Sequence, residues 1–187
     1  MTAWQQQLTD IVQTLASIVR NIQLRLALHD VCPEPHLNFW RLIYGDLTDF
    51  AVVECCKLFG SDDEQHQTTH WKNVVSDREQ FGGDLLASLK LSMEEFFEYW
   101  QEMKGYRDMP VAHHDPGRRN ILNFPNFNLA LESTYFYYDY ANGELQALGF
   151  QENPKDIRRY AMDFANQSKV IAAAAMEATK TISEKVY

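Results

Sequence analysis

The chain has 187 residues, of which 45% are hydrophobic and 13% aromatic, enough to pack the core of a folded domain and too many for general disorder. Its 26 acidic and 17 basic side chains give a formal net charge of −9, which opposes nonspecific attraction to nucleic acid. Any phosphate-bearing partner must therefore meet a local basic patch. With no Pro/Gly/Ser-rich linker and no internal repeat, we predict one domain over residues 1–187.

The cellular location is predicted from the N-terminus and the cysteines. The opening "MTAWQQQLTDIVQ" has neither the basic nor the apolar region of a signal peptide, and the chain has no run of about 18 apolar residues. Cys32, Cys55 and Cys56 are odd in number, and two are adjacent in an apolar run, which is typical of buried thiols in a reducing compartment. We expect a cytoplasmic protein without a membrane span.

Two long helices are predicted in the first third of the chain. Apolar positions from Trp4 to Leu26 recur at steps of three, four and one, which places them on one stripe of a helix that ends at "CPEP". A second helix, from about His36 to Phe59, is apolar almost all round and stops at Gly60. Helices of this kind usually lie inside a bundle or at a dimer interface.

The next stretch predicts an interruption and then a third helix. Residues 61–91 are polar and mixed, with "GSDDEQHQTTHW" and "FGG" breaking the periodicity, so we expect a flexible loop that carries short helical turns. Ser92 stands three residues before Glu95, the spacing of a capping box. The third helix is therefore predicted to begin at Ser92.

Two further helices complete the predicted fold. The fourth carries Phe127 and Tyr138 on its apolar positions and ends at Asn142 and Gly143. The fifth opens with Asn153 as N-cap and Pro154 at the first helical position. Its predicted apolar seam comprises Ile157, Ala161, Phe164, Ser168, Ile171, Ala175, Ala178 and Ile182. Since no segment predicts a strand, the fold class is all-α, an up-and-down bundle of about five main helices with short additions.

The stretch "KGYRDMPVAHHDPGRRN" holds the candidate site residues. On the third helix Arg107 continues the line of Phe96, Trp100 and Met103, so the arginine extends an apolar stripe. A half-buried guanidinium requires a carboxylate, a phosphate or several carbonyls as partner, because an unpaired charge there would be very costly.

Two interpretations of this stretch stand side by side. In the first, Arg107 and Asp108 form ordinary ion pairs, and the histidines end a helix whose C-terminus favours positive charge. In the second, a histidine acts as general acid or base while the arginine holds a phosphate, which suits phosphodiester transfer without a metal. On a straight helix His114 would lie nearer to Arg107 than His113, but Pro110 between them interrupts that geometry.

The order Arg107, Asp108 and then "AHHD" resembles the arginine, polar residue, variable run, histidine signature of the HEPN superfamily (higher eukaryotes and prokaryotes nucleotide-binding). The segments "NFWRLIYGDLTDFAVVECCKLFG", "THWKNV" and "LALESTYFYYD" look like its abortive-infection U branch, over most of the chain. The resemblance implies an all-α bundle that pairs as a homodimer, with the two signatures meeting across a cleft. In active members it implies a metal-independent endoribonuclease of phage defence or of toxin–antitoxin systems.

By position, the resemblance implies that Arg107 and His113 are the central catalytic pair and that Asp108 orients the arginine. The family pattern selects His113, whereas the helical wheel favours His114, so His114 stays a second candidate. Arg118 and Arg119 are candidates to hold flanking RNA phosphates. The expected partners are RNA, a second copy of the chain and an antitoxin or other protein, with no cofactor.

Two alternatives were weighed against this hypothesis. His66 and His70, at i and i+4, would share one face of a helix as metal ligands. His113, His114 and Asp115 could also chelate a metal ion, but adjacent histidines point in different directions on a helix. We expect no metal. The rival functional class is a noncatalytic helical module that binds another protein through its long apolar helices.

Overall fold

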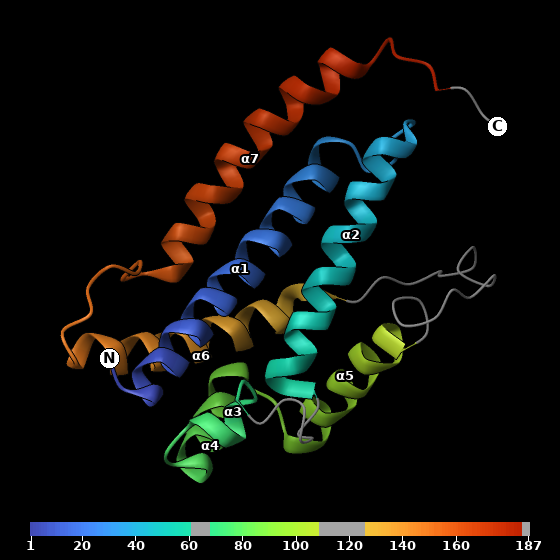
Figure 1. Ribbon diagram of the computed structural model, residues 1–187. Coiled ribbons are helices and arrows are strands. Elements are labelled where there is room, and N and C mark those ends of the chain that lie inside the picture. The colour runs from blue at the N-terminus through green and yellow to red at the C-terminus, as the bar shows by residue number, and fades with distance from the viewer. Residues whose placement is uncertain (61–67, 109–125, 185–187) are drawn as a thin grey trace.

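The computed structural model describes residues 1–60, 68–108 and 126–184, which fold into helices with no strand among them (Figure 1). The predicted all-α class is confirmed. The helices are α1 (Ala3–Val31), α2 (Asn38–Cys55), the π-helical turn η1 (Cys56–Gly60), α3 (Trp71–Val74), α4 (Arg78–Leu89), α5 (Met93–Tyr106), α6 (Phe127–Ala147) and α7 (Ile157–Thr179).

Helix α1 is the centre of the bundle. It lies between α2 and α7, and α6 crosses its lower part (Figure 1). Its predicted stripe is buried from Leu8 to Ile22, and Thr2 begins the helix through a reciprocal capping box with Gln5. Among the described helices, none combines the length and the apolar character that crossing a bilayer requires.

The prediction of a loop with short helical turns over 61–91 is wrong for residues 78–89. The four-residue helix α3 is a short turn as expected, but α4 is a regular helix of 12 residues, which Asp77 caps by accepting a hydrogen bond from the Gln80 N–H. Gly82, which suggested a break, lies where an added Cβ would be 3.2 Å from the Trp71 ring. The glycine therefore allows α4 to pack closely on α3, and this contact outweighs its poor helix propensity. Residues 61–67 lie outside the described part of the chain.

Helix α5 begins as predicted. Ser92 and Glu95 form a reciprocal capping box, and the Ser92 backbone N–H donates to Glu95 at 2.8 Å. Phe96, Trp100 and Met103 are buried along one face. Trp100 stacks on Phe59 of η1, with ring centroids 5.0 Å apart, and this contact holds α5 against the end of α2.

The predicted end of α6 and start of α7 are both wrong. Helix α6 continues past Asn142 because that side chain is buried and donates to the Pro154 carbonyl at 3.2 Å. The helix ends at Leu148–Gly149, where Gly149 has φ +91° and the Phe150 N–H donates to the Leu145 carbonyl at 3.0 Å. Helix α7 is capped by Asp156, so Asn153 and Pro154 precede it in the connecting segment.

The predicted apolar seam of α7 is confirmed in the first half of the helix and wrong in the second half. Ile157, Ala161 and Ser168 are buried as predicted, but the buried position further on is Ala172, while Ile171 is 68% exposed. The small side chain of Ala172 allows α7 to lie close to α1. With Ala172 on the inner face, the larger neighbouring side chains of α7 face outward. Large apolar side chains of α7 are therefore exposed, namely Met162, Val170 and Ile171.

Candidate functional site

The arginine–aspartate pair singled out in the sequence lies at the end of α5. Regular helix ends at Tyr106, and Arg107 and Asp108 follow in a π-helical turn. The Arg107 Nε donates to the Asp108 Oδ1 at 2.7 Å, and the Arg107 side chain is 23% exposed against 57% for Asp108. The guanidinium is thus mostly buried and held by a charged acceptor.

Cys56 of η1 lies close enough to this pair to feel its charges. Burial raises the pKa of the Cys56 thiol to about 11, while the positive charges of Arg107 and Lys104 act to lower it. Cys56 is consequently a neutral thiol at physiological pH, and its surroundings are those of a core residue and not of a nucleophile.

Helices η1 and α5 approach each other closely at Gly60. A Cβ at this position would be 3.3 Å from the Lys104 side chain and 3.4 Å from that of Cys56. The glycine permits this approach, and η1 therefore packs against the last turns of α5. π-Helical segments are rare and often accompany functional sites, and here one stands on each side of the contact.

A network of polar side chains ties α5 to α1 and α2 next to Arg107. The Tyr106 hydroxyl donates to the Asp49 carboxylate at 3.0 Å. Arg25 of α1 donates to the Thr48 hydroxyl at 3.2 Å and lies over the Tyr44 ring at 4.6 Å. Burial lowers the pKa of Arg25, and its proximity to the Tyr44 and Tyr106 phenols opposes that shift. The hydrogen bond to Asp49 fixes the position of Tyr106, the residue directly before the candidate arginine.

The contact between Tyr106 and Asp49 makes a testable contribution to stability. We expect Tyr106→Phe to lower the free energy of unfolding by about 1 kcal/mol, since it removes one hydrogen bond to a charged acceptor in a half-buried setting. Urea titration followed by circular dichroism measures this change. Tyr140→Phe, which removes a 3.3 Å contact with Ser76 at an exposed site, is the matched control. Equal destabilisation by both variants would contradict the role given to Asp49.

The remaining candidate residues are outside what the structure describes. His113, His114, Arg118 and Arg119 fall within residues 109–125, and His66 within residues 61–67. The structure therefore brings together Arg107 and Asp108 and leaves the partner histidine a prediction. His70, the other histidine considered as a metal ligand, is buried and caps α3 by accepting a hydrogen bond from the Lys72 N–H at 3.2 Å. In the described ranges, no three His, Cys, Asp or Glu side chains are grouped so that they could hold a metal ion.

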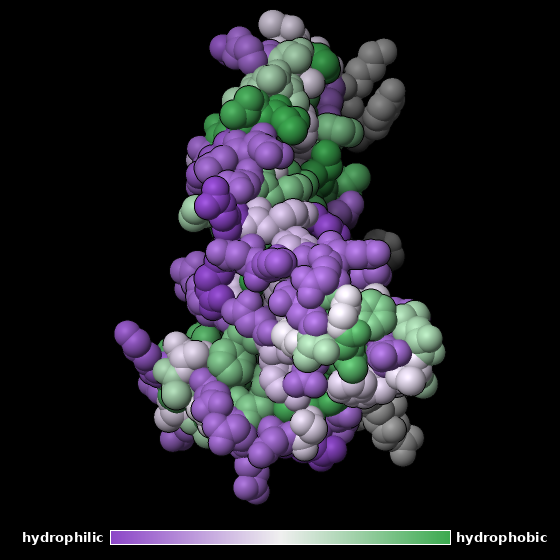
Figure 2. All heavy atoms as spheres, turned by 90° about the vertical axis from the view of Figure 1, so that its left-hand side faces the viewer, coloured by the Kyte–Doolittle hydropathy of each residue, from purple (hydrophilic) through white to green (hydrophobic). Residues whose placement is uncertain are grey.

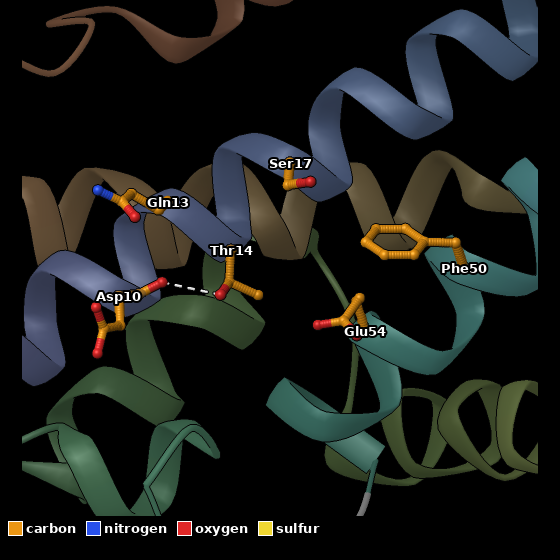
Figure 3. Close-up of a pocket in the computed structure, with 6 residues that line it drawn as sticks. All are labelled: Asp10, Gln13, Thr14, Ser17, Phe50 and Glu54. Carbon is orange, nitrogen blue, oxygen red and sulfur yellow. Dashed lines mark hydrogen bonds between the residues drawn. The ribbon is translucent and has the colours of Figure 1, made fainter.

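A shallow groove between α1 and α2 is acidic, in contrast to the surroundings of the Arg107 guanidinium. Its volume is about 460 Å³, and Figure 3 shows Asp10 at one end of it and Glu54 at the other, below the Phe50 ring. Thr14 donates to the Asp10 backbone carbonyl at 2.8 Å, and Lys57 pairs with Glu54. Two carboxylates repel phosphate, so this groove does not extend a site for nucleic acid.

The basic residues at the start of α7 have acidic partners. Arg158 donates to Asp139 at 2.9 Å and to Glu132 at 3.3 Å, and it lies over the Tyr135 ring at 4.9 Å. The charge of Arg158 is therefore balanced by two carboxylates. The attraction of the two carboxylates raises the pKa of Arg158 despite the opposing effect of its partial burial.

Sequence reasoning missed two residues near the end of α5, namely Asp49, which accepts from Tyr106, and Cys56, which lies near the charge of Arg107. Asp49 stands in the apolar run "LIYGDLTDFAVV", and an acid in such a run is a signal for a buried partner. Its partner Tyr106 is distant in sequence, so spacing alone does not identify it. Comparisons with protein-family models, curated proteins and solved structures find no match for this chain.

Proposed function

We propose that the protein is a metal-independent endoribonuclease of HEPN type in which Arg107 stabilises the reacting phosphate and His113 transfers protons. The observation that carries this proposal is the Arg107 side chain, mostly buried yet 23% exposed, held at Nε by Asp108 at 2.7 Å. A guanidinium fixed in this way suits bidentate binding of a phosphate better than a mobile surface charge does.

In the proposed reaction, the ribose 2′-oxygen attacks the adjacent phosphorus as His113 accepts the 2′-hydroxyl proton. The phosphorus–5′-oxygen bond then breaks as the leaving oxygen takes a proton, which gives a 2′,3′-cyclic phosphate and a 5′-hydroxyl. Arg107 stabilises the negative charge of the pentacoordinate phosphate. His114 is the alternative proton carrier, and Arg118 and Arg119 are proposed to bind flanking phosphates.

The reaction itself supplies the test of this proposal. Wild-type protein in EDTA is expected to cut a short RNA and leave a cyclic phosphate, which acid hydrolysis and mass spectrometry identify. The same oligonucleotide with 2′-deoxyribose at the cut position should resist, because it lacks the attacking oxygen. No cleavage of the RNA, or cleavage of the deoxy substrate, would refute the proposal.

Asp108 has the proposed role of a positioning residue. We expect Asp108→Asn to lower kcat for RNA cleavage about tenfold with little change in KM, since the hydrogen bond to Arg107 loses its charge. Asp108→Glu should recover part of the rate. Asp84→Asn, at an exposed carboxylate on α4 that accepts from Gln80 at 2.7 Å, is the control and should leave kcat unchanged. Equal rates for Asp108→Asn and wild type would contradict this role.

The proposed assembly is a homodimer, in which two copies of the signature line one cleft. Large apolar side chains are exposed on α2 and α7, among them Phe39, Leu42, Val170 and Ile171. Figure 2 shows hydrophobic side chains at the top of one face, above a broad hydrophilic band. Such faces on a folded chain favour association with a second surface. The same observation favours the second candidate function, a noncatalytic helical module that binds another protein, such as an antitoxin.

A further inference from the structure

A second concave region lies beside the groove of Figure 3, and Gln13 of α1 lines both. Its volume is about 360 Å³, and it forms where α1 meets α6 and the segment that leads into α7 (Figure 1). Tyr138 of α6 is a buried lining residue, while Gln13 and Arg20 of α1 are exposed. Polar and apolar side chains contribute similarly to its lining, which suits a small ligand with both polar and apolar groups.

One wall of the pocket is held by two hydrogen bonds. The Tyr138 hydroxyl donates to the Pro154 carbonyl at 2.9 Å, and the Asn142 amide donates to the same oxygen at 3.2 Å. Burial raises the pKa of Tyr138 to about 12, so its hydroxyl stays protonated at physiological pH. The connecting segment is therefore fixed against α6, and a ligand would meet a wall that is already ordered.

Two hydrogen-bond donors converge at the exposed side of the pocket. The Arg20 Nη1 donates to the Tyr160 hydroxyl oxygen at 3.5 Å, and the Tyr160 ring stacks on Phe164 with centroids 6.3 Å apart. Because the phenol oxygen is the acceptor in this contact, its own O–H is able to donate to a further acceptor. A guanidinium and a hydroxyl at this separation can bind the same oxyanion.

The charge around the pocket has one sign. Of its described lining residues none is acidic, and Arg20 supplies a positive charge. The adjacent carboxylate of Asp139 is paired with Arg158 at 2.9 Å. This pocket therefore differs from the groove of Figure 3, which presents Asp10 and Glu54. An anion is favoured here although the whole chain carries a net charge of −9.

We infer that this pocket binds a small ligand in which a planar ring carries a phosphate or a carboxylate. The ring packs against the half-buried Tyr160 and Pro154, and the anionic group accepts hydrogen bonds from Arg20 and the Tyr160 hydroxyl. The amides of Gln13 and Asn153 are available for polar atoms on the ring edge. The inference is independent of the proposed ribonuclease, because the pocket shares no described residue with the surroundings of Arg107.

Isothermal titration calorimetry of the full chain tests the inference with phenyl phosphate and benzoate as probes. At least one of them should bind with Kd below about 1 mM. Inorganic phosphate and phenol, which carry the anion or the ring alone, should bind at least about tenfold more weakly. Comparison of the Kd values of phenyl phosphate and benzoate also shows whether the site prefers a phosphate or a carboxylate. Failure of both to bind overturns the inference, as does equal binding of inorganic phosphate.

Matched variants locate the binding. Arg20→Gln should weaken the better probe about tenfold, and Tyr160→Phe, which keeps the ring and removes only the hydroxyl, should weaken it by a smaller factor. Arg78→Gln removes the same charge from exposed α4 and should leave Kd unchanged. Far-UV circular dichroism verifies the fold of each variant. Unchanged binding in both pocket variants, or equal weakening by Arg78→Gln, overturns the assignment.

Discussion

Replacing His113 with alanine should abolish RNA cleavage, with a fall in kcat of about 10²- to 10⁴-fold, since that is the usual contribution of a general acid or base. His114→Ala should keep the rate within about threefold of wild type, because the HEPN pattern assigns the proton transfer to His113. Single-turnover cleavage of a labelled RNA in EDTA measures both variants side by side.

The pair of histidine variants also carries its own control. The two substitutions remove the same group from adjacent positions, so a nonspecific loss of charge would affect them alike. A larger loss in His114→Ala would transfer the role to His114, as helical-wheel geometry favours, and would contradict the assignment by family pattern. Similar rates for both variants and wild type would remove histidine chemistry from the proposal.

The second large effect concerns the scaffold of the site. Trp100→Ala should lower the free energy of unfolding by about 3–5 kcal/mol, since it removes a buried ring that stacks on Phe59 and leaves a cavity. The loss should separate η1 from α5 and so disturb Arg107. Urea titration monitored by circular dichroism measures the stability, and the RNA assay measures the consequence for the site.

Phe97 is the matched control for Trp100 because it is also an aromatic side chain of α5 but is largely exposed to solvent. It is 59% exposed, so Phe97→Ala should change the free energy of unfolding by less than about 1 kcal/mol. A comparable loss in the two variants would show that the packing of Trp100 on Phe59 does not hold α5 in place.

Two parts of the fold that depend on local sequence were predicted correctly. The buried stripe of α1 follows from the spacing of its apolar residues, and the start of α5 follows from Ser92 and Glu95, which lie within one turn. Both signals involve neighbouring residues on a single helix, so no knowledge of the tertiary structure is needed to interpret them.

The errors occur where tertiary contacts outweigh local signals. Gly82 suggested a loop, but close packing on Trp71 makes it a helical residue. Asn142 suggested the end of α6, but its bond to the Pro154 carbonyl keeps it inside the helix. On α7, burial of Ala172 in place of Ile171 depends on how closely α1 approaches, which the sequence of α7 alone does not specify.

In the candidate site too, local contacts were predictable from the sequence and long-range contacts were not. The contact of Arg107 with Asp108 joins adjacent residues and was predictable, whereas the contact of Tyr106 with Asp49 joins two helices and was not. The pocket beside Arg20 was likewise invisible in the sequence, because its walls come from α1, α6 and the segment before α7. The structure adds the information of which residues from distant parts of the sequence lie next to one another.

The most direct test of the central claim is the rate of RNA cleavage in EDTA by wild type, Arg107→Ala, Arg107→Lys and the control Arg78→Ala. If Arg107 stabilises the reacting phosphate, the alanine variant should lose about 10²- to 10³-fold in kcat. The lysine variant should recover only part of it, since an ammonium lacks the planar fork of a guanidinium. The Arg78 variant should match wild type. Cleavage by folded Arg107→Ala at the wild-type rate would contradict the account.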